Sequence, residues 1–550
     1  MFKKIVGIFI LIIMFFVETN LATFVMHSTD LKMELPKVKI NINPCTIVYE
    51  GDIIECNITG NPLIKYWFIN NQSFHTTFYG DNPIIFDPEP TPLDTNYVNL
   101  TVYVENNYGN ASDTIQVIIK RIYFGDIHWH TFLSDGYYPL ELMYNNAKKD
   151  NYLDFACPTD HTFNYFNRKF LIPYTWQRTK NLVNKHYIPG DFTTFLAYEY
   201  SSTQIRINNI DFPSWIDRGH INFYYKNVYQ DALAYSRIKT YTFNNIFKSM
   251  SDEWDKGNKN ICFFHHPLAG GLWPLNRSFS INWTNFLNKI EKREFRDVAL
   301  KIFRGVEVYS RWGTAIGKYS NIPIHWNYSS VTIDDNQDCW VENALWEWSE
   351  NIYTKNFPFI LLASSDTHGL GRPGSARINI WKKNPSGIIA AYSIHNTRDE
   401  IWDSMNNCSI YGSQLLKIRA NVRFNGQMVL GQWINCSSNL TIRITAQSTF
   451  PGNDCSGKNM CPDGYSSNEL CYNISDIWLI KKDRQKGRPW CKIISHVIPN
   501  DNLAVFTFVD DDVHPNDFYF IVIRQKGQEL QPKEDAYMAI IGPVFIKDVV

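Results

Sequence analysis

Short apolar runs alternate with stretches of helical periodicity between residues 122 and 412. Seven runs are typical of strands: RIYFGDIHWH, YLDFACPTDH, TTFLAYEYSS, GHINFYY, NICFFHHP, FRGVEVYS and FPFILLASSDTH. Segments such as PLELMYNNAKKD lie between them, and Pro139 suits the first position of a helix. Strands that alternate with helices favour a parallel sheet covered by helices. Seven such strands within fewer than 300 residues predict a closed (β/α) barrel.

The segments on either side of this region have the alternating pattern of β-structure. In residues 36–121, NLTVYVEN and DTIQVIIK flank the turn NYGNAS and predict a hairpin. The length and strand spacing suit an immunoglobulin-like β-sandwich, and the hairpin resembles the last one of polycystic-kidney-disease-type modules. Residues 413–550 contain NLTIRITAQS, LAVFTFVDDD and DFYFIVIRQKG and predict a C-terminal β-sandwich. We therefore expect an α/β fold class, with a barrel at 122–412 between two β-sandwiches.

The first 25 residues predict export of the chain. Lys3 and Lys4 precede an unbroken apolar run at residues 5–17. This run is shorter than the roughly 20 residues of a membrane span and suits the core of a cleaved signal peptide. An uncleaved anchor, which would tether the chain to a membrane, is the alternative. Both interpretations place the rest of the chain outside the cytoplasm, either secreted or anchored at the cell surface.

The cysteine content indicates the redox compartment of the chain, and the net charge bears on which partners it can bind. The 11 cysteines fit an oxidising compartment. Cys157 and Cys262 lie in apolar runs and are expected to be buried thiols. The formal net charge of −1 does not indicate a nucleic-acid partner. The disulfide candidates, with their pairing left open, are Cys45, Cys56, Cys436, Cys455, Cys461, Cys471 and Cys491.

Residues that can bind a metal follow or end the strand-like runs. His128 and His130 are two positions apart on a predicted strand, so both side chains point to the same side, and Asp135 can fold back after a turn. The carboxyl ends of barrel strands converge on one face. So many imidazoles and carboxylates would be costly to gather without a cation, which predicts a metal centre. The other residues of this kind are Asp160, His161, Glu199, His220, His265, His266, Glu307, Asp366 and His368.

These segments also resemble a known family. DIHWHTFLSDG, PTDH, AYE, GH, HHP, GVEVYS and SSDTHG resemble, in this order, the motifs of the PHP (polymerase and histidinol phosphatase) superfamily. The β-rich flanks and the ending ASSDTHGLGRPGSAR resemble an uncharacterised, exported branch of it. The resemblance implies a distorted (β/α)7 barrel, two or three bound metal ions and hydrolysis of phosphoesters.

The resemblance further implies the roles of individual residues. Glu199 matches the carboxylate that bridges two metals, and His266 is chosen over His265 because the family's ligand directly precedes proline. His265 then either contacts substrate or faces the outer helices. We also expect Asp160 to orient a ligand histidine. Glu307 has no clear ligand role, and we expect it either to support a ligand from behind or to pack with a hydrogen bond. Arg372 either clamps a phosphate or is a solvated surface residue. The implied metal ligands are His128, His130, Asp135, His161, Glu199, His220, His266, Asp366 and His368.

Mixed imidazole and carboxylate ligands favour zinc, manganese or iron over calcium or magnesium. Two such cations activate a shared water molecule, which predicts a hydrolase. The family resemblance makes a phosphoesterase the leading expectation. Two alternatives remain: hydrolysis of amides or non-phosphate esters at the same site, and a non-catalytic cell-surface binding protein. The expected substrate is a phosphorylated or ester small molecule or a glycan. Aromatic residues in NYFNRKFLIPYTWQRTK and LAGGLWPLNRSFSINW either stack on a sugar or base, or belong to the core.

Overall fold

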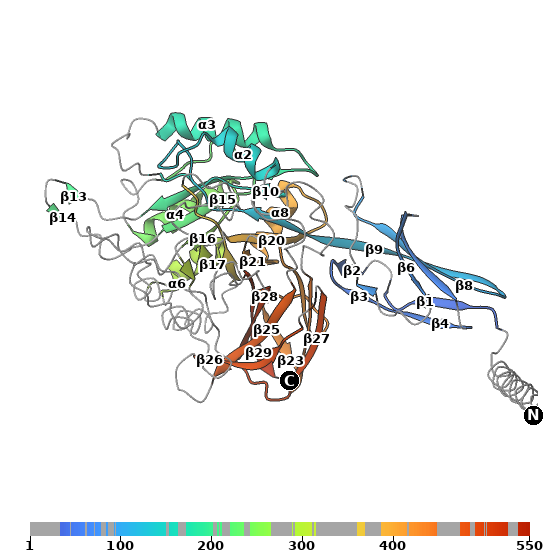
Figure 1. Cartoon of the computed structure of the whole chain (residues 1–550). Coiled ribbons are helices and arrows are strands. Elements are labelled where there is room, and N and C mark those ends of the chain that lie inside the picture. The colour runs from blue at the N-terminus through green and yellow to red at the C-terminus, as the bar shows by residue number, and fades with distance from the viewer. Residues whose placement is uncertain are drawn as a thin grey trace, which may run out of the picture. The chain divides into compact units, whose positions relative to one another are not determined.

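The structure is a computed structural model of the chain (Figure 1). The predicted signal peptide or anchor, His266, Arg372, Cys45, Cys455, Cys461 and Cys471 lie outside the residues that it describes. Among those it does describe, no helix combines the length and the apolar character needed to cross a membrane. The described residues are 34–43, 46–60, 63–70, 72–78, 84–85, 93, 95–149, 153–162, 172–201, 206–207, 210–211, 220–235, 242–265, 289, 292–310, 313–314, 360–368, 387–414, 417–447, 473–483, 490–499, 501, 503–525 and 537–549.

The chain divides into two compact units, Met1–Val48 with Asp52–Ile119, and Tyr49–Gly51 with Lys120–Val550. In the described part of the first unit, β8 and β9 form the antiparallel hairpin that the alternating sequence predicts. Every second residue of β8 from Val98 to Val104 is buried, and Trp67 lies in the same core. The immunoglobulin-like assignment stays a prediction. The strands of this unit are β1 (Lys37–Ile40), β2 (Ile47–Tyr49), β3 (Ile53–Ile54), β4 (Cys56–Thr59), β5 (Ile64–Ile69), β6 (Gln72–Phe78), β7 (Ile84–Ile85), β8 (Val98–Asn106) and the start of β9 (Gly109–Asp126).

The second unit contains the five helices of the described residues. They are α2 (Leu140–Lys149), α3 (Ile172–His186), α4 (Phe243–Asp255), α6 (Arg293–Ile302) and α8 (Arg398–Asn406). The strands that belong to the predicted barrel region are the end of β9, β10 (Phe155–Ala156), β11 (Thr193–Thr194), β12 (Leu196–Ser201), β13 (Arg206–Ile207), β14 (Ile210–Asp211), β15 (His220–Tyr225), β16 (Asn260–His265), β17 (Phe303–Ser310), β18 (Gly313–Thr314), β19 (Ile360–Ala363), β20 (Gly387–Ser393) and the start of β21 (Ile410–Gln414).

The sheet that carries Glu199 and His220 has the strand order β12-β15-β16-β17, with β19 paired to β17. Successive side chains of a strand point to opposite faces. Tyr198 of β12 and Phe223 of β15 therefore pack into one buried cluster. Ala197 and Tyr224, their neighbours along the two strands, pack into another. Glu199 lies on the Ala197 face, which is the face directed at the site.

Two features of this region differ from the sequence prediction. First, the expected parallel order is wrong for β15, which runs antiparallel to both β12 and β16, whereas β16, β17 and β19 are parallel to one another. An antiparallel strand needs no helical crossover, and alternation alone does not report strand direction. Second, closure of a (β/α) barrel is not confirmed. The described residues are β-rich, and their strands pair in several sheets rather than in one closed ring.

The C-terminal residues form β-sheets, as their alternating pattern indicates. β22-β24-β27 is a three-stranded antiparallel sheet, and β26-β25-β28-β29 is an antiparallel run of a larger one. Their assignment to a sandwich stays a prediction. No disulfide joins two of the cysteines whose side chains the structure describes, which include the candidates Cys56 and Cys436. The side chain of the candidate Cys491 lies outside this described part. Cys157, Cys262, Cys408 and Cys436 are buried thiols. The strands are β22 (Arg419–Phe424), β23 (Trp433–Cys436), β24 (Leu440–Gln447), β25 (Ile474–Asp483), β26 (Trp490–Val497), β27 (Leu503–Asp510), β28 (Phe518–Gln525) and β29 (Tyr537–Val549).

Candidate metal centre

The end of β9 brings His128 and His130 to the centre of the site. Trp129, between them, is fully buried and packs edge-on against Tyr144 of α2. Because alternate residues of an extended segment point in opposite directions, the two imidazoles turn away from this apolar contact. Both are almost completely buried. The two rings converge, with 3.3 Å between their Nε2 atoms.

The segment after β19 lies beside His128 and His130 and supplies Asp366. The backbone N–H of Asp366 donates to the carbonyl of His128 (2.7 Å), and that of His130 donates to the carbonyl of Thr367 (2.9 Å). Asp366 has φ 49°, a conformation uncommon for residues other than glycine. Its Oδ1 lies 3.3 Å from His128 Nε2 and 3.1 Å from His130 Nε2. The two backbone bonds hold this strained residue where its carboxylate meets both imidazoles.

The antiparallel direction of β15 explains how His220 joins the site. His220 begins its strand, whereas Ser201 and His265 end theirs, and the register pairs His220 with both residues. All three side chains therefore share one edge and one face of the sheet. Ser201 Oγ lies 2.6 Å from His161 Nδ1, a contact that the sequence analysis missed.

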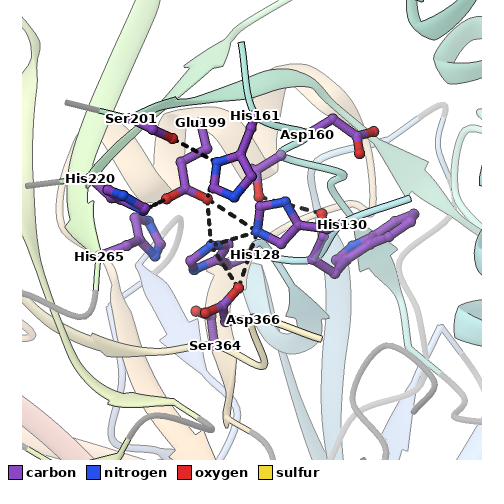
Figure 2. A network of polar contacts seen from close by, with 12 residues as sticks. His128, His130, Asp160, His161, Glu199, Ser201, His220, His265, Ser364 and Asp366 are labelled. Carbon is purple, nitrogen blue, oxygen red and sulfur yellow. Dashed lines mark hydrogen bonds and ion pairs between the residues drawn. The ribbon is translucent and has the colours of Figure 1, made fainter. Parts of the chain in front are cut away.

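Glu199 lies at the middle of the cluster (Figure 2). Its Oε2 is 3.1 Å from Nε2 of both His128 and His130, and 3.5 Å from His161 Nδ1. Its Oε1 contacts His220 Nδ1. The carboxylate is completely buried, and its two oxygens face different sets of imidazoles. Glu199 therefore contacts four imidazoles that come from three separate segments.

Asp135 forms a second meeting point. Its Oδ2 lies 3.2 Å from His368 Nε2 and 3.5 Å from His161 Nε2, and its Oδ1 lies 3.6 Å from His130 Nδ1. Asp135 is on the loop of residues 131–138 that follows β9. The N–H of Tyr137 in this loop donates to the carbonyl of His368 (2.8 Å), which joins the loop to the end of the β19 segment.

The donor atoms fit divalent cations. Four groups each bring three or four ligand atoms within 4.8 Å of one another, close enough to surround one ion. The donors are imidazole nitrogens and carboxylate oxygens, which suit zinc, manganese or iron. The groups share His128, His130 and His161, so they are neighbouring positions of one centre. They are His130, Asp135, His161 and His368; His128, His130 and Asp366; His128, His265 and Glu307; and His161, Glu199 and His220.

Opposite charges hold the cluster together electrostatically. Burial by itself raises the pKa of a carboxyl group, but His161, His220 and His128 lower the pKa of Glu199 well below its usual value. Burial lowers the pKa of an imidazole, yet Asp366 and Glu199 raise the pKa of His130 to about 10. Protons on the imidazoles thus balance the carboxylates, which is the role that cations would take.

The structure brings together eight of the nine predicted ligands: His128, His130, Asp135, His161, Glu199, His220, Asp366 and His368. The ninth, His266, is outside the described residues, as is Arg372. The roles of all these residues, as metal ligands or as catalytic groups, stay predictions.

Asp160 and His265 have other surroundings than expected. Asp160 accepts hydrogen bonds from Thr131 and Ser134 (2.6–2.8 Å) and therefore holds the loop that carries Asp135.

The interpretation that His265 faces the outer helices is wrong, because its side chain lies on the site face, fully buried. It contacts Glu307 and Tyr224, so protein groups rather than an open pocket surround it. Strand alternation from His220 could have identified Tyr224 in the sequence.

One family matches residues 138–268, 131 of the 550 residues, and it is described as a protein of unknown function (DUF3604). No curated protein matches the chain.

Among solved structures, one similar chain is a two-domain protein of Bacteroides vulgatus described as containing a predicted PHP-like metal-dependent phosphoesterase. It is 10% identical, with a TM-score of 0.32, and the match covers 77% of this chain and 95% of that one. A β-glucuronidase of Bacteroides uniformis is 8% identical, with a TM-score of 0.17 and coverage of 94% and 63%. TM-scores this low do not establish a shared fold.

Proposed function

We propose that residues 122–412 form a metal-dependent phosphoesterase of the PHP type. Two independent observations support this proposal. The motifs occur in the family's order along the sequence. The residues assigned from those motifs, although spread from His128 to His368, meet in one buried cluster.

A distorted barrel is part of the proposal. Isolated bridges pair His161 with Glu199 and Trp129 with Thr367, in both cases parallel. The first continues the path of β10 towards β12, and the second brings the end of the β19 segment to the end of β9. A ring completed by single bridges instead of full strand pairs would account for a barrel that is irregular at the end where the metals bind.

The observation that carries the proposal is the position of Glu199. One oxygen faces His128, His130 and His161, and the other faces His220. Two adjacent cations held in this way would supply a water molecule with a pKa near neutrality and would polarise phosphoryl oxygens. The protein's own part is to hold the ligands, and Asp160 and Ser201 support this by hydrogen bonds to the loop and to His161.

Export and the substrate are further parts of the proposal. The apolar run at residues 5–17 supports an extracytoplasmic location, secreted or anchored. A phosphorylated small molecule or glycan is the proposed substrate.

The test combines metal analysis with a substrate screen on the purified full-length chain. We expect at least two equivalents of transition metal, and turnover of phosphate monoesters or diesters that chelation abolishes. The variants His128→Ala and Asp366→Ala should bind less metal, and their kcat/KM should fall by about 100-fold or more. This decrease is larger than the roughly 10- to 100-fold decrease typical when a residue that only supports a ligand is removed.

His514→Ala is the matched control, since His514 is half exposed on the C-terminal sheet region and contacts Asp512. It should leave metal content and turnover unchanged. If the chain cleaved amides or carboxyl esters but no phosphate esters, the proposed phosphoesterase would be wrong and the alternative hydrolase would be correct. Bound metal without any turnover would favour a binding protein, and turnover that survives both site variants would refute the site.

A further inference from the structure

A second layer of buried polar residues lies behind the metal ligands. It consists of Tyr224 on β15, His265 on β16, Glu307 on β17 and Ser364 after β19. All four are at most 1% exposed. A carboxylate and an imidazole at such depth are costly unless they are paired. The partners of Glu307 therefore indicate what this layer does.

Glu307 lies between two imidazoles. Its Oε2 is 3.1 Å from His265 Nδ1 and 3.6 Å from His128 Nδ1, and its Oε1 accepts a hydrogen bond from Ser364 Oγ (2.8 Å). The other nitrogen of His128, Nε2, faces Glu199 and Asp366. Glu307 thus approaches His128 from the side opposite to the proposed cations.

His265 supports this arrangement from the side. Its Nδ1 faces Glu307, and its Nε2 lies 3.1 Å from the hydroxyl of Tyr224. That hydroxyl also lies 2.9 Å from the carbonyl of Ile127, the residue directly before His128. The ring of His265 packs edge-on against the ring of His128, with 4.3 Å between the centroids. Both nitrogens of His265 are therefore directed at protein partners.

We infer that Glu307 is the positioning residue of the metal centre, with His265 and Tyr224 as its support. This inference rests on the proposed metal binding, and not on which ester is cleaved. Glu307 fixes the ring of His128 from its Nδ1 side, so that Nε2 is directed at the position bordered by Glu199 and Asp366, where the proposed cation would accept its lone pair. Ligand histidines commonly have a carboxylate on their second nitrogen, and loss of that partner typically weakens metal affinity 10- to 100-fold.

Two other roles for Glu307 predict different results. If Glu307 were itself a metal ligand together with His128 and His265, its removal would abolish one metal equivalent even at saturating metal. If Glu307 were only a buried ion-pair partner, its removal would lower stability and leave metal affinity unchanged. Stoichiometry and affinity together separate the three roles.

The experiment is a metal titration of the full-length chain after chelation, with Zn²⁺ or Co²⁺, for the wild type and Glu307→Gln. We expect unchanged stoichiometry at saturation, an affinity about 10- to 100-fold weaker, and an altered visible spectrum of the cobalt form. Glu253→Gln is the matched control. Glu253 is an equally buried carboxylate on α4 that bonds Tyr235, Lys256 and Asn258. This variant should lose stability but keep the wild-type metal affinity.

Tyr224→Phe provides a second test if Glu307→Gln does not fold. It removes only the hydroxyl that meets His265 and the Ile127 carbonyl, and a smaller loss of affinity in the same direction is expected. A lost equivalent in Glu307→Gln, or wild-type affinity in both variants, would overturn the inference. A wild-type chain that binds metal but cleaves no ester would refute the proposed hydrolase and leave this comparison decisive.

Discussion

His130 illustrates how the site determines the charge of single residues. Its ring is fully enclosed, and burial alone would keep it neutral. Asp366 and Glu199 reverse this and raise its pKa from 6.5 to about 10. The same two carboxylates raise the pKa of His128, and Glu199 and Asp135 raise the pKa of His161. In the absence of metal the folded chain therefore holds protons that the unfolded chain releases near pH 6.5.

This predicts how the stability of the metal-free chain depends on pH. Because the pKa of His130 is higher in the folded state, its contribution to stability is complete below pH 6.5 and is lost as the pH rises towards 10. The pKa of His265 is lowered to about 4, so its contribution to stability changes with pH below 6.5 and not between pH 6.5 and 10. Chelated protein should unfold at a lower urea concentration at pH 8.5 than at pH 6.5.

The metal-loaded chain is the control, since cations replace the protons and the decrease should be smaller. Equal midpoints for the metal-free chain at both pH values would contradict the predicted charge state of the cluster.

The loop of residues 131–138 shows how one element places a ligand. Gly136 lies so close to the segment after β9 that an added Cβ would be 2.3 Å from the carbonyl oxygen of His130. The loop is further held by hydrogen bonds from Thr131 and Ser134 to Asp160. These contacts set the direction in which Asp135 returns to the site.

Gly136→Ala should displace this loop because the obstructing atoms belong to the backbone. We expect loss of the metal position that Asp135 serves, and a decrease in kcat/KM of about 10- to 100-fold, comparable to loss of a supporting contact. Metal content and steady-state kinetics check this.

Gly257→Ala is the matched control. Gly257 has φ +101° with no atom within 4 Å of an added Cβ, so the change costs backbone strain away from the site. If Gly136→Ala retained full metal content and activity, the role given to the loop would be wrong.

At the scale of the whole molecule, the centre joins segments that are distant in sequence. Its eight assigned ligands come from the segment after β9, the segment after β10, strands β12 and β15, and the segment after β19. Cations bound there would connect these elements in the folded state only. Ligand binding of this kind stabilises a protein by about 2.7 kcal/mol when the free ligand is 100 times its Kd.

Chelation should therefore increase hydrogen exchange selectively. We expect faster exchange at residues 128–135, 159–161, 199–201 and 366–368, measured by mass spectrometry with and without chelator. Strand β8 belongs to the other compact unit and should exchange at the same rate in both states. A uniform change, or none, would argue against metals that connect these segments.

The sequence by itself determined which residues can bind a metal and which segments are β-structured. The spacing of His128 and His130 and the alternation in NLTVYVEN are local features, and local geometry is sufficient to interpret them. Helix α2 followed in the same way from its apolar spacing and Pro139. Sequence patterns could not show that β15 reverses direction, because alternation is the same in both directions.

Only the tertiary structure decided how the residues meet. The register of β12, β15 and β16 places Ser201, His220 and His265 on one edge. The backbone bonds of His128 with Asp366 and of His130 with Thr367 join residues more than 230 positions apart. The sequence marks His265 and Glu307 as polar residues of strand-like runs, but their contacts with each other, with Ser364 and with Tyr224 arise only through packing of separate strands. Long-range pairing and burial, rather than the chemistry of single residues, assign each imidazole its partner.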